Sequence, residues 1–283
     1  MKIAATVILY YPNEIVIRNI QSYINSVERL YIVDNTEIPV AQITERLIEF
    51  PNSIYLHDGE NKGIAARLNQ ASHLATKEGY DWLLTMDQDS SFQEKILINY
   101  LNCFHSFAGK EKVSMFGISY FEKMTNLQIC NSIKVNELIT SGSLLNLQLV
   151  PVIGEFDEKL FIDEVDFEYC LKSVLNGFGI FRFTNIFLTH NLGETSYHRS
   201  FKTFKLTSRV LHSPERIYYM TRNILYVQSI YGKATFNEIK IRKMKLLNRY
   251  KNNLLYNKKR FQVIKYIAKG YWDYKKNRMG KLK

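Results

Sequence analysis

The chain has few cysteines, and none of them forms a recognisable ligand or disulfide motif. Its 283 residues include Cys103, Cys130 and Cys170, which lie far apart with no Cys-x-x-Cys pair. We therefore expect neither zinc nor disulfide bonds to organise the fold. A reducing cytoplasm is the compartment that best fits this cysteine usage.

Long apolar runs are also absent. The N-terminal run of residues 3–9 is apolar but short, lacks a small-residue cleavage site after it, and continues into Tyr10, Tyr11 and Pro12. It predicts a first strand and not a signal peptide. No uncharged apolar stretch is long enough to cross a bilayer, so we expect no membrane-spanning helix.

The glycine-rich phosphate loops of the familiar nucleotide-binding folds are missing as well. The first predicted strand is followed by Tyr11, Pro12 and Asn13, with no Gly-x-Gly-x-x-Gly and no Gly-Lys-Ser. This absence argues against dinucleotide-dependent enzymes and Walker-type ATPases. It also argues against a sugar nucleotidyltransferase, which would need a glycine-rich loop bearing Arg or Lys at this place.

The chain nevertheless has a composition that builds a full core, since 46% of its residues are hydrophobic. Its first ninety residues alternate strand and helix, which is typical of a parallel nucleotide-binding sheet. The predicted strands are 3–10, 29–34, 53–57, 81–87, 113–120, 127–135, 138–145, 179–183 and 186–190. The predicted helices are 14–26, 41–50, 64–79, 92–107, 163–176 and 214–231.

Positive charge is concentrated at the C-terminal end. Residues 233–283 hold 17 Lys and Arg against two acids, a net charge of +15, while residues 1–232 hold 21 basic and 25 acidic groups, a net of −4. Apolar residues recur at roughly helical spacing within this basic segment. We therefore expect a domain at 1–232 and a basic amphipathic helical tail at 233–283.

Two carboxylates follow the fourth predicted strand. Asp87 and Asp89 flank Gln88 directly after an apolar run, so both point to one side at the carboxyl end of a buried strand. Ligands of parallel sheets bind beyond that end, and paired carboxylates hold divalent cations. The pattern predicts a shared Mg²⁺ or Mn²⁺, although Asp-x-Asp is also an ordinary loop and helix cap.

A second acid cluster surrounds Asp163 and Asp166. If a helix starts at Asp163, both acids lie on its apolar stripe, one turn before Phe167 and Cys170. Capping and the helix dipole explain Asp163 well, at a few tenths to about 1 kcal/mol. Asp166 faces the interior and is a candidate general base, with a structural acid as the equal alternative.

Other polar residues are weaker candidates. Gly63 lets the backbone approach a ligand just after Asn61, although a simple strand-to-helix turn is the more common reading. His190 ends a predicted strand and is a metal-ligand candidate if it shares a cavity with the Asp pair. Arg222 is a candidate partner for a diphosphate, with a solvated helix face as the alternative.

Nine segments in this order resemble the family 2 glycosyltransferases, and among them rhamnosyltransferase-like enzymes of bacterial surface polysaccharide synthesis. The resemblance covers about residues 3–230. The segments are 7–12 (Val-Ile-Leu-Tyr-Tyr-Pro), 33–35 (Val-Asp-Asn), 61–65 (Asn-Lys-Gly-Ile-Ala), 87–90 (Asp-Gln-Asp-Ser), 140–143 (Thr-Ser-Gly-Ser), 154–157 (Gly-Glu-Phe-Asp), 161–172, His190, and 218–223 (Tyr-Tyr-Met-Thr-Arg-Asn).

The resemblance implies a GT-A fold, an α/β architecture with a Rossmann-like mixed sheet, and an inverting transfer of rhamnose or a hexose. By its analogy Asp34 recognises the pyrimidine base, Asp87 the ribose or donor sugar, and Asp89 the metal, assisted by His190. Asp166 is implied as the general base, with Asp163 as the second catalytic candidate. The expected donor contacts are Tyr10, Asp34, Asn61, Gly63, Arg67, Asp87 and Arg222.

The expected donor is dTDP-rhamnose or a UDP-sugar, and the expected acceptor is a lipid-linked saccharide. The +15 tail suits an anionic membrane, since each Lys or Arg near such a surface adds about 1 kcal/mol. These features predict a cytoplasmic protein, peripheral at the inner face of a bacterial plasma membrane. The alternatives are a nucleic-acid-binding protein that uses the tail and a non-catalytic scaffold. In the favoured interpretation, a transferase, no nucleic acid is expected as a partner.

Overall fold

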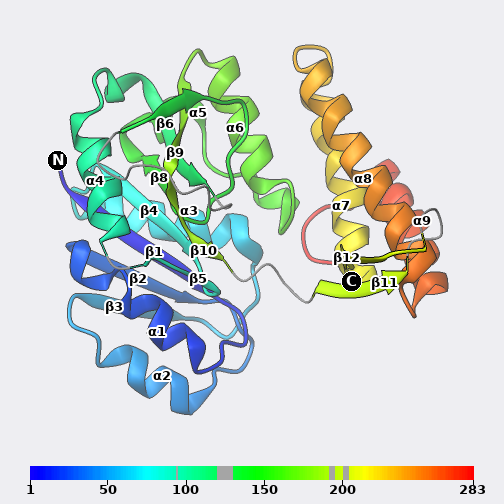
Figure 1. Cartoon of the computed structure of the whole chain (residues 1–283), viewed down its shortest axis with the longest axis horizontal. Coiled ribbons are helices and arrows are strands. Elements are labelled where there is room, and N and C mark those ends of the chain that lie inside the picture. Colours follow the sequence, from blue (N-terminus) through cyan, green and yellow to red (C-terminus); the bar gives the residue numbers. More distant parts are fainter. Residues whose placement is uncertain (94, 120–129, 191–194, 200–203) are drawn as a thin grey trace. The chain divides into compact units, whose positions relative to one another are not determined.

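The computed structural model of the protein describes residues 1–93, 95–119, 130–190, 195–199 and 204–283 (Figure 1). Two compact units are present. Unit 1 comprises Met1–Glu158 and Val165–Asn191, and unit 2 comprises Lys159–Glu164 and Leu192–Lys283. The division after residue 191 differs from the expected one after residue 232, because the helix of residues 214–231 packs with the basic helices that follow it.

Unit 1 is built on an eight-stranded mixed sheet in the order β3-β2-β1-β4-β8-β6-β9-β7 (Figure 1). The strands are β1 (Ile3–Leu9), β2 (Arg29–Asp34), β3 (Ser53–His57), β4 (Trp82–Asp87), β6 (Val113–Ser119), β7 (Ser132–Lys134), β8 (Ser143–Asn146) and β9 (Gly179–Phe187). The helices are α1 (Ile15–Gln21), α2 (Ala41–Ile48), α3 (Gly63–Lys77), α4 (Ile96–Ser106), α5 (Val150–Ile153) and α6 (Val165–Leu175). The mixed α/β architecture expected from the resemblance is confirmed.

The core of unit 1 follows from the alternation of side chains along the strands. On one face, Ala5, Val7 and Leu9 of β1 join a continuous apolar cluster with residues of α1, α2 and α4. On the other face, α3 packs against β1, β2 and β4, and α6 packs against β9. Because both faces are covered, the parallel strands are largely apolar runs; Thr6 and Thr85 are buried polar residues within them, and the acids Asp34 and Asp87 lie at their carboxyl ends.

The register of the parallel strands brings the carboxyl ends of β1, β2, β3 and β4 to one end of the sheet, here called the rim. Leu9 at the end of β1 pairs with Asp34 of β2, and Ile8 pairs with Asp87 of β4. Asp34 in turn pairs with His57 at the end of β3. Residues as far apart in sequence as Leu9 and Asp87 thereby lie together at the carboxyl ends of the strands, which is where α/β folds bind ligands.

Several predicted elements differ in extent. The predicted strand 127–135 is observed as β7, and its residues 127–129 lie outside the described part. The predicted strands 179–183 and 186–190 become the single β9 followed by the short β10 (Thr189–His190). Helix α6 begins at Val165, so Asp163 precedes it and does not lie on its apolar stripe. The reason is the left-handed backbone of Asp163, with φ of 60°, which no α-helix accepts.

Among its described residues, unit 2 contains three α-helices, the first of which matches the predicted helix 214–231, and a hairpin of two strands that the sequence did not predict. They are α7 (Pro214–Tyr231), α8 (Phe236–Tyr256), α9 (Arg260–Lys275), β11 (Thr195–Arg199) and β12 (Leu206–Val210). Gly270 brings α9 against α7 so closely that a Cβ there would lie 2.8 Å from the carbonyl oxygen of Tyr218. The basic segment is therefore part of a folded unit and not a free tail. No described helix is long and apolar enough to span a membrane.

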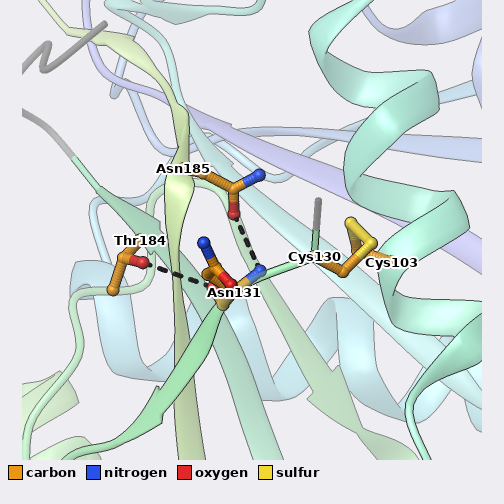
Figure 2. The surroundings of a disulfide bond; sticks show 5 residues. All are labelled: Cys103, Cys130, Asn131, Thr184 and Asn185. Carbon is orange, nitrogen blue, oxygen red and sulfur yellow. Dashed lines mark hydrogen bonds between the residues drawn. A yellow bond between two sulfur atoms is a disulfide. The ribbon is translucent and has the colours of Figure 1, made fainter. Parts of the chain in front are cut away.

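A disulfide joins Cys103 of α4 to Cys130, which corrects the expectation that the fold lacks one (Figure 2). The pairing follows from the sheet. Asn131, next to Cys130, donates its N–H to Asn185 and accepts from Thr184, two residues of β9, and α4 packs on that same strand. The sequence separation of 27 conceals this proximity, since linear spacing does not show which elements pack on the same strand. Cys170 is buried and is not part of a disulfide.

Candidate active site

Gln88 fixes the geometry of the acid pair at the end of β4. Its side chain accepts from the N–H of Tyr10 at 2.8 Å and donates to the carbonyl of Tyr10 at 3.2 Å. Its own carbonyl accepts from Asn19 Nδ2 at 2.8 Å. Asp87 and Asp89, on either side of Gln88, are both partly exposed. The middle residue of the motif therefore joins the ends of β1 and β4, which holds the two carboxylates at the rim.

The segment 140–143 supports this rim from the other side and shows roles that the sequence did not reveal. Ser141 Oγ accepts from the N–H of Asp87 at 3.3 Å and lies 2.8 Å from Ser90 Oγ. Gly142 has φ of 71°, and a Cβ there would lie 2.9 Å from Ile118 Cδ1, so only glycine fits. In the sequence, the only indication of these contacts is that the motif Asp-Gln-Asp-Ser is followed later by Thr-Ser-Gly-Ser.

His190 lies in β10, which pairs with β5 (Ser90–Ser91) in antiparallel register, His190 opposite Ser90. Its backbone is thus placed beside the residue that follows Asp89, as the sequence predicts for a residue at this rim. The side chain of His190 lies outside the described part of the structure. Its role as a metal ligand stays a prediction.

A cavity of about 230 Å³ opens next to the acid pair. Its lining includes Asp89, Gln88 and Asn13, together with apolar atoms of Ile15 and Val16 at the start of α1. Tyr10, whose backbone Gln88 holds, is 45% exposed and makes an edge contact with the ring of Tyr11. A mixed polar and apolar hollow bordered by an acid is the kind of place where a ligand with a charged group is oriented.

A hydrogen-bond network at the ends of β2 and β3 connects two of the motifs. Asn35 donates through Nδ2 to Asn61 Oδ1 at 2.8 Å, and its Oδ1 accepts from the N–H of Lys62 at 2.8 Å. Gly63 opens α3 with φ of 84°, and its N–H donates to Asn61 Oδ1. Asn61 and Gly63 thus organise the turn into α3, which is the structural role that their local chemistry favoured.

Arg67, one of the expected donor contacts, completes that network. It is 1% exposed. Its guanidinium has five N–H donors, and the structure gives them five acceptors, which are Asn35, Gln70, the carbonyl of Glu60 and, twice, Asp58. The hydrogen bonds from Arg67 hold the pKa of Asp58 well below its usual range. No donor of this arginine is left for a phosphate.

Asp34 lies at the rim but points inward, with 1% of its surface exposed. Its carboxylate accepts from Tyr55 Oη at 2.6 Å and from both the N–H and the hydroxyl of Thr36. Burial, and then this hydrogen bond to Asp34, raises the pKa of Tyr55 well above its usual value, so the phenol remains a donor. Contact of Asp34 with a nucleotide base would require this buried carboxylate to become accessible.

The two candidate catalytic acids of the second cluster are separated by the unit boundary. Asp166 is the second residue of α6 in unit 1 and is partly exposed; its Oδ1 accepts from the N–H of Phe167 at 2.8 Å. Asp163 belongs to unit 2, where it forms an ion pair with Arg216 at 3.2 Å. The guanidinium of Arg216 thus contacts the carboxylate of Asp163, and the role of Asp166 as the general base stays a prediction.

Arg222, the second arginine among the candidate donor contacts, also has its N–H donors occupied by protein acceptors. It is completely buried in unit 2. Its five N–H donors meet the side chains of Asn223 and Tyr218 and the carbonyls of Gly280, Lys159 and Leu160. A helix residue chosen for its charge as a diphosphate partner is therefore the centre of a buried polar network.

The donor set at the rim fits a hard divalent cation that is shared with a substrate. Asp87 and Asp89 supply carboxylate oxygens, the ligands that Mg²⁺ and Mn²⁺ prefer. Among the described residues no group of three or more His, Cys, Asp or Glu side chains is arranged to hold a metal. Mg²⁺ dehydrates reluctantly and is commonly coordinated by one or two protein carboxylates together with oxygens of a substrate's phosphates.

No family model matches the chain, but comparisons with known proteins found similar enzymes. A dTDP-rhamnosyl transferase of Shigella flexneri, RfbF, is 26% identical, with 78% of each chain covered. TarS of S. aureus has a TM-score of 0.54 at 15% identity over 96% of this chain, which spans 49% of TarS. Its fragment 1–349 was also solved with UDP-GlcNAc. GalNAc-T7, solved with UDP, GalNAc and Mn²⁺, has a TM-score of 0.55 over 67% of this chain at 9% identity.

The sheet, the rim and these likenesses together define a glycosyltransferase of the GT-A fold, as the sequence resemblance predicts. More particularly, the chain is similar to a bacterial enzyme that transfers rhamnose from a nucleotide sugar.

Proposed function

We propose that the protein transfers rhamnose or a hexose, with inversion, from a nucleoside diphosphate sugar to a saccharide in bacterial surface polysaccharide synthesis, as a member of glycosyltransferase family 2. The observation that carries the proposal is the rim at which Gln88 holds the end of β1 against the acid pair of β4. The similarity to a dTDP-rhamnosyl transferase supports dTDP-rhamnose as donor, and the TarS complex with UDP-GlcNAc supports a UDP-sugar as the alternative.

In this proposal Asp87 and Asp89 hold a divalent cation and Tyr10 contacts the nucleotide at the end of β1. When bound, the cation would neutralise the negative charge of the diphosphate leaving group. The cavity beside Asp89 is placed to take part of the donor. The Mn²⁺ in the GalNAc-T7 structure is consistent with a divalent metal in this fold.

Asp166 acts as the general base. It takes the proton from the acceptor hydroxyl as that oxygen attacks the anomeric carbon, while the bond from this carbon to the nucleoside diphosphate breaks. One displacement of this kind inverts the configuration of the sugar. The partial exposure of Asp166 at the first turn of α6 lets an acceptor reach it.

A donor screen tests the proposal. We expect the full-length protein to release nucleotide from dTDP-rhamnose or one UDP-hexose when a saccharide acceptor and Mg²⁺ or Mn²⁺ are present. A GDP-sugar is the control, and EDTA should remove the activity because the diphosphate loses its counter-ion. Absence of turnover with every donor, in the presence of lipid-linked and free saccharides, would refute the transferase assignment.

We further propose a lipid-linked acceptor and an anionic membrane surface as partners, at the cytoplasmic face of a plasma membrane. The support is the solvent face of α8 and α9, where large apolar side chains alternate with lysines and which belongs to a segment of net charge +15. The exposed apolar residues are Phe236, Ile241, Met244, Leu247, Leu255, Phe261, Ile264, Tyr271 and Trp272. In a reducing cytoplasm the pair Cys103 and Cys130 would be held as thiols.

Removing exposed apolar groups from this face should weaken membrane binding without unfolding unit 2. We expect the triple variant Leu247→Ser, Phe261→Ser, Trp272→Ser to bind phosphatidylglycerol vesicles about 10-fold or more weakly, because burial of each side chain contributes up to about 2 kcal/mol. The matched control is Ile38→Ser, an exposed apolar residue of unit 1 that is 74% exposed.

Co-sedimentation across a salt series, with phosphatidylcholine vesicles for comparison, measures both contributions. The electrostatic part should weaken as salt rises, whereas the apolar part should persist. Equal sedimentation of the triple variant and the Ile38→Ser control would show that α8 and α9 do not contact the lipid.

A further inference from the structure

The segment Lys159–Glu164, here called the acid loop, has an unusual backbone. Phe161, Asp163 and Glu164 all have left-handed conformations, with φ of 65°, 60° and 65°. Residues other than glycine rarely adopt this conformation, because their Cβ approaches the following carbonyl. Three such residues within four positions persist only where the surroundings hold them. The acid loop belongs to unit 2, yet it is continuous with Val165 and Asp166 of α6.

Asn223 of α7 makes the densest contact with the acid loop. Its Nδ2 donates to the carbonyl oxygens of Leu160 at 2.8 Å, Ile162 at 2.7 Å and Asp163 at 3.0 Å. The side chain is completely buried. The two N–H groups of this amide are thus shared among three carbonyl oxygens of the acid loop, and those of Ile162 and Asp163 lie outside any helix or strand.

Arg222 anchors the beginning of the acid loop. It donates to the carbonyls of Lys159 and Leu160 and, through another nitrogen, to the carbonyl of Gly280. Gly280 donates its N–H back to the carbonyl of Lys159 at 2.8 Å. The residues that follow α9 therefore close over the same loop that α7 holds.

Side chains of the acid loop are fixed as well. Phe161 stacks on Tyr219 with ring centres 5.3 Å apart. Glu164 is buried and accepts from Arg242 of α8 at 2.7 Å. Together with the Asp163–Arg216 pair, these contacts restrain each left-handed residue through its side chain and the loop through its carbonyls.

We propose that Arg222 and Asn223, with Arg216, Tyr219 and Arg242, form a clamp that positions Asp166 for catalysis. The inference rests on the proposed function, in which Asp166 is the general base. Glu164 is the last residue of the acid loop, and Asp166 lies only two residues further along the chain, so a restrained loop restrains the backbone that leads directly to the base. In this proposal the motif Tyr-Tyr-Met-Thr-Arg-Asn at 218–223 positions the general base and does not itself contact a ligand.

The test compares Asn223→Ala with the matched control Asn248→Ala, an exposed asparagine of α8, in the full-length protein. In Asn223→Ala we expect amide hydrogen exchange of residues 160–168 to quicken by about 10-fold or more, since the loop loses three hydrogen bonds. We expect kcat of sugar transfer to fall by about 10-fold or more because the base is misplaced, with the donor KM within about twofold. The control should match the wild type in both.

A folded Asn223→Ala protein with normal kcat would overturn the proposal, because a structural amide would change stability and not the split between kcat and KM. If Asn223→Ala does not fold, Arg216→Gln decides by the same measurements, since the side chain of Arg216 is 53% exposed. An inactive wild type would instead refute the proposed function, whereas equal activity of wild type and variant refutes the clamp alone.

Discussion

Replacing Asp166 by asparagine is expected to lower sugar transfer by about 10²-fold or more while the fold and donor affinity stay nearly unchanged. The amide keeps the shape of the carboxylate and its acceptance of the N–H of Phe167, but it cannot take the proton of the acceptor hydroxyl. Steady-state kinetics with the donor found in the screen, together with calorimetric donor binding, measure the two parts of the prediction.

Asp163→Asn is the matched comparison for Asp166→Asn, because it changes the same chemical group three residues earlier. Its carboxylate is already paired with Arg216, so loss of the charge should have a milder effect on transfer, exerted through the acid loop. If Asp163→Asn stops transfer while Asp166→Asn remains active, the assignment of the base is wrong.

Asp89→Ala is expected to abolish metal-dependent binding of the nucleotide sugar. A hard cation that bridges protein and diphosphate depends on anionic oxygen ligands, and the described rim offers Asp87 and Asp89 as its carboxylates. Calorimetry with the donor, with and without Mg²⁺ or Mn²⁺, measures the affinity and its dependence on metal.

Asp81→Ala provides the control for Asp89→Ala. Asp81 directly precedes β4 and accepts from the N–H of Lys2 at 2.8 Å, so it lies at the opposite end of the same strand. Its removal should leave metal-dependent donor binding intact. Unchanged affinity and unchanged metal dependence in Asp89→Ala would remove Asp89 from the site.

Clusters of charge were the least reliable part of the reading from sequence. Arg67 and Arg222 stand in promising motifs, yet each has all its N–H donors occupied by partners of the same unit. The sequence shows that an arginine has five N–H donors, but it does not show which groups accept from them. One acceptor of Arg222 is the carbonyl of Gly280, 58 residues further along the chain. Only a folded chain shows whether such a side chain is available to a ligand.

The basic C-terminal segment carries the same lesson. Its charge and helical periodicity were correct, since α8 and α9 are helices whose exposed faces mix lysines with apolar groups. Its packing could not be derived from the sequence; in the structure α8 and α9 both pack on α7, with Gly270 against it. Composition gives the net charge of a segment, whereas only tertiary packing shows whether that segment is part of a folded unit.

The sequence by itself determined the features that arise from local periodicity. Strands buried on both faces become apolar runs whose polar residues gather at their ends, so the alternation of elements and the placement of Asp87 and Asp89 could be derived without coordinates. Tertiary structure alone decided which distant groups meet. Gln88 joins two strand ends, Cys103 pairs with Cys130, and Asn223 holds the acid loop, because each of these contacts joins residues that only the folding of the chain brings within reach.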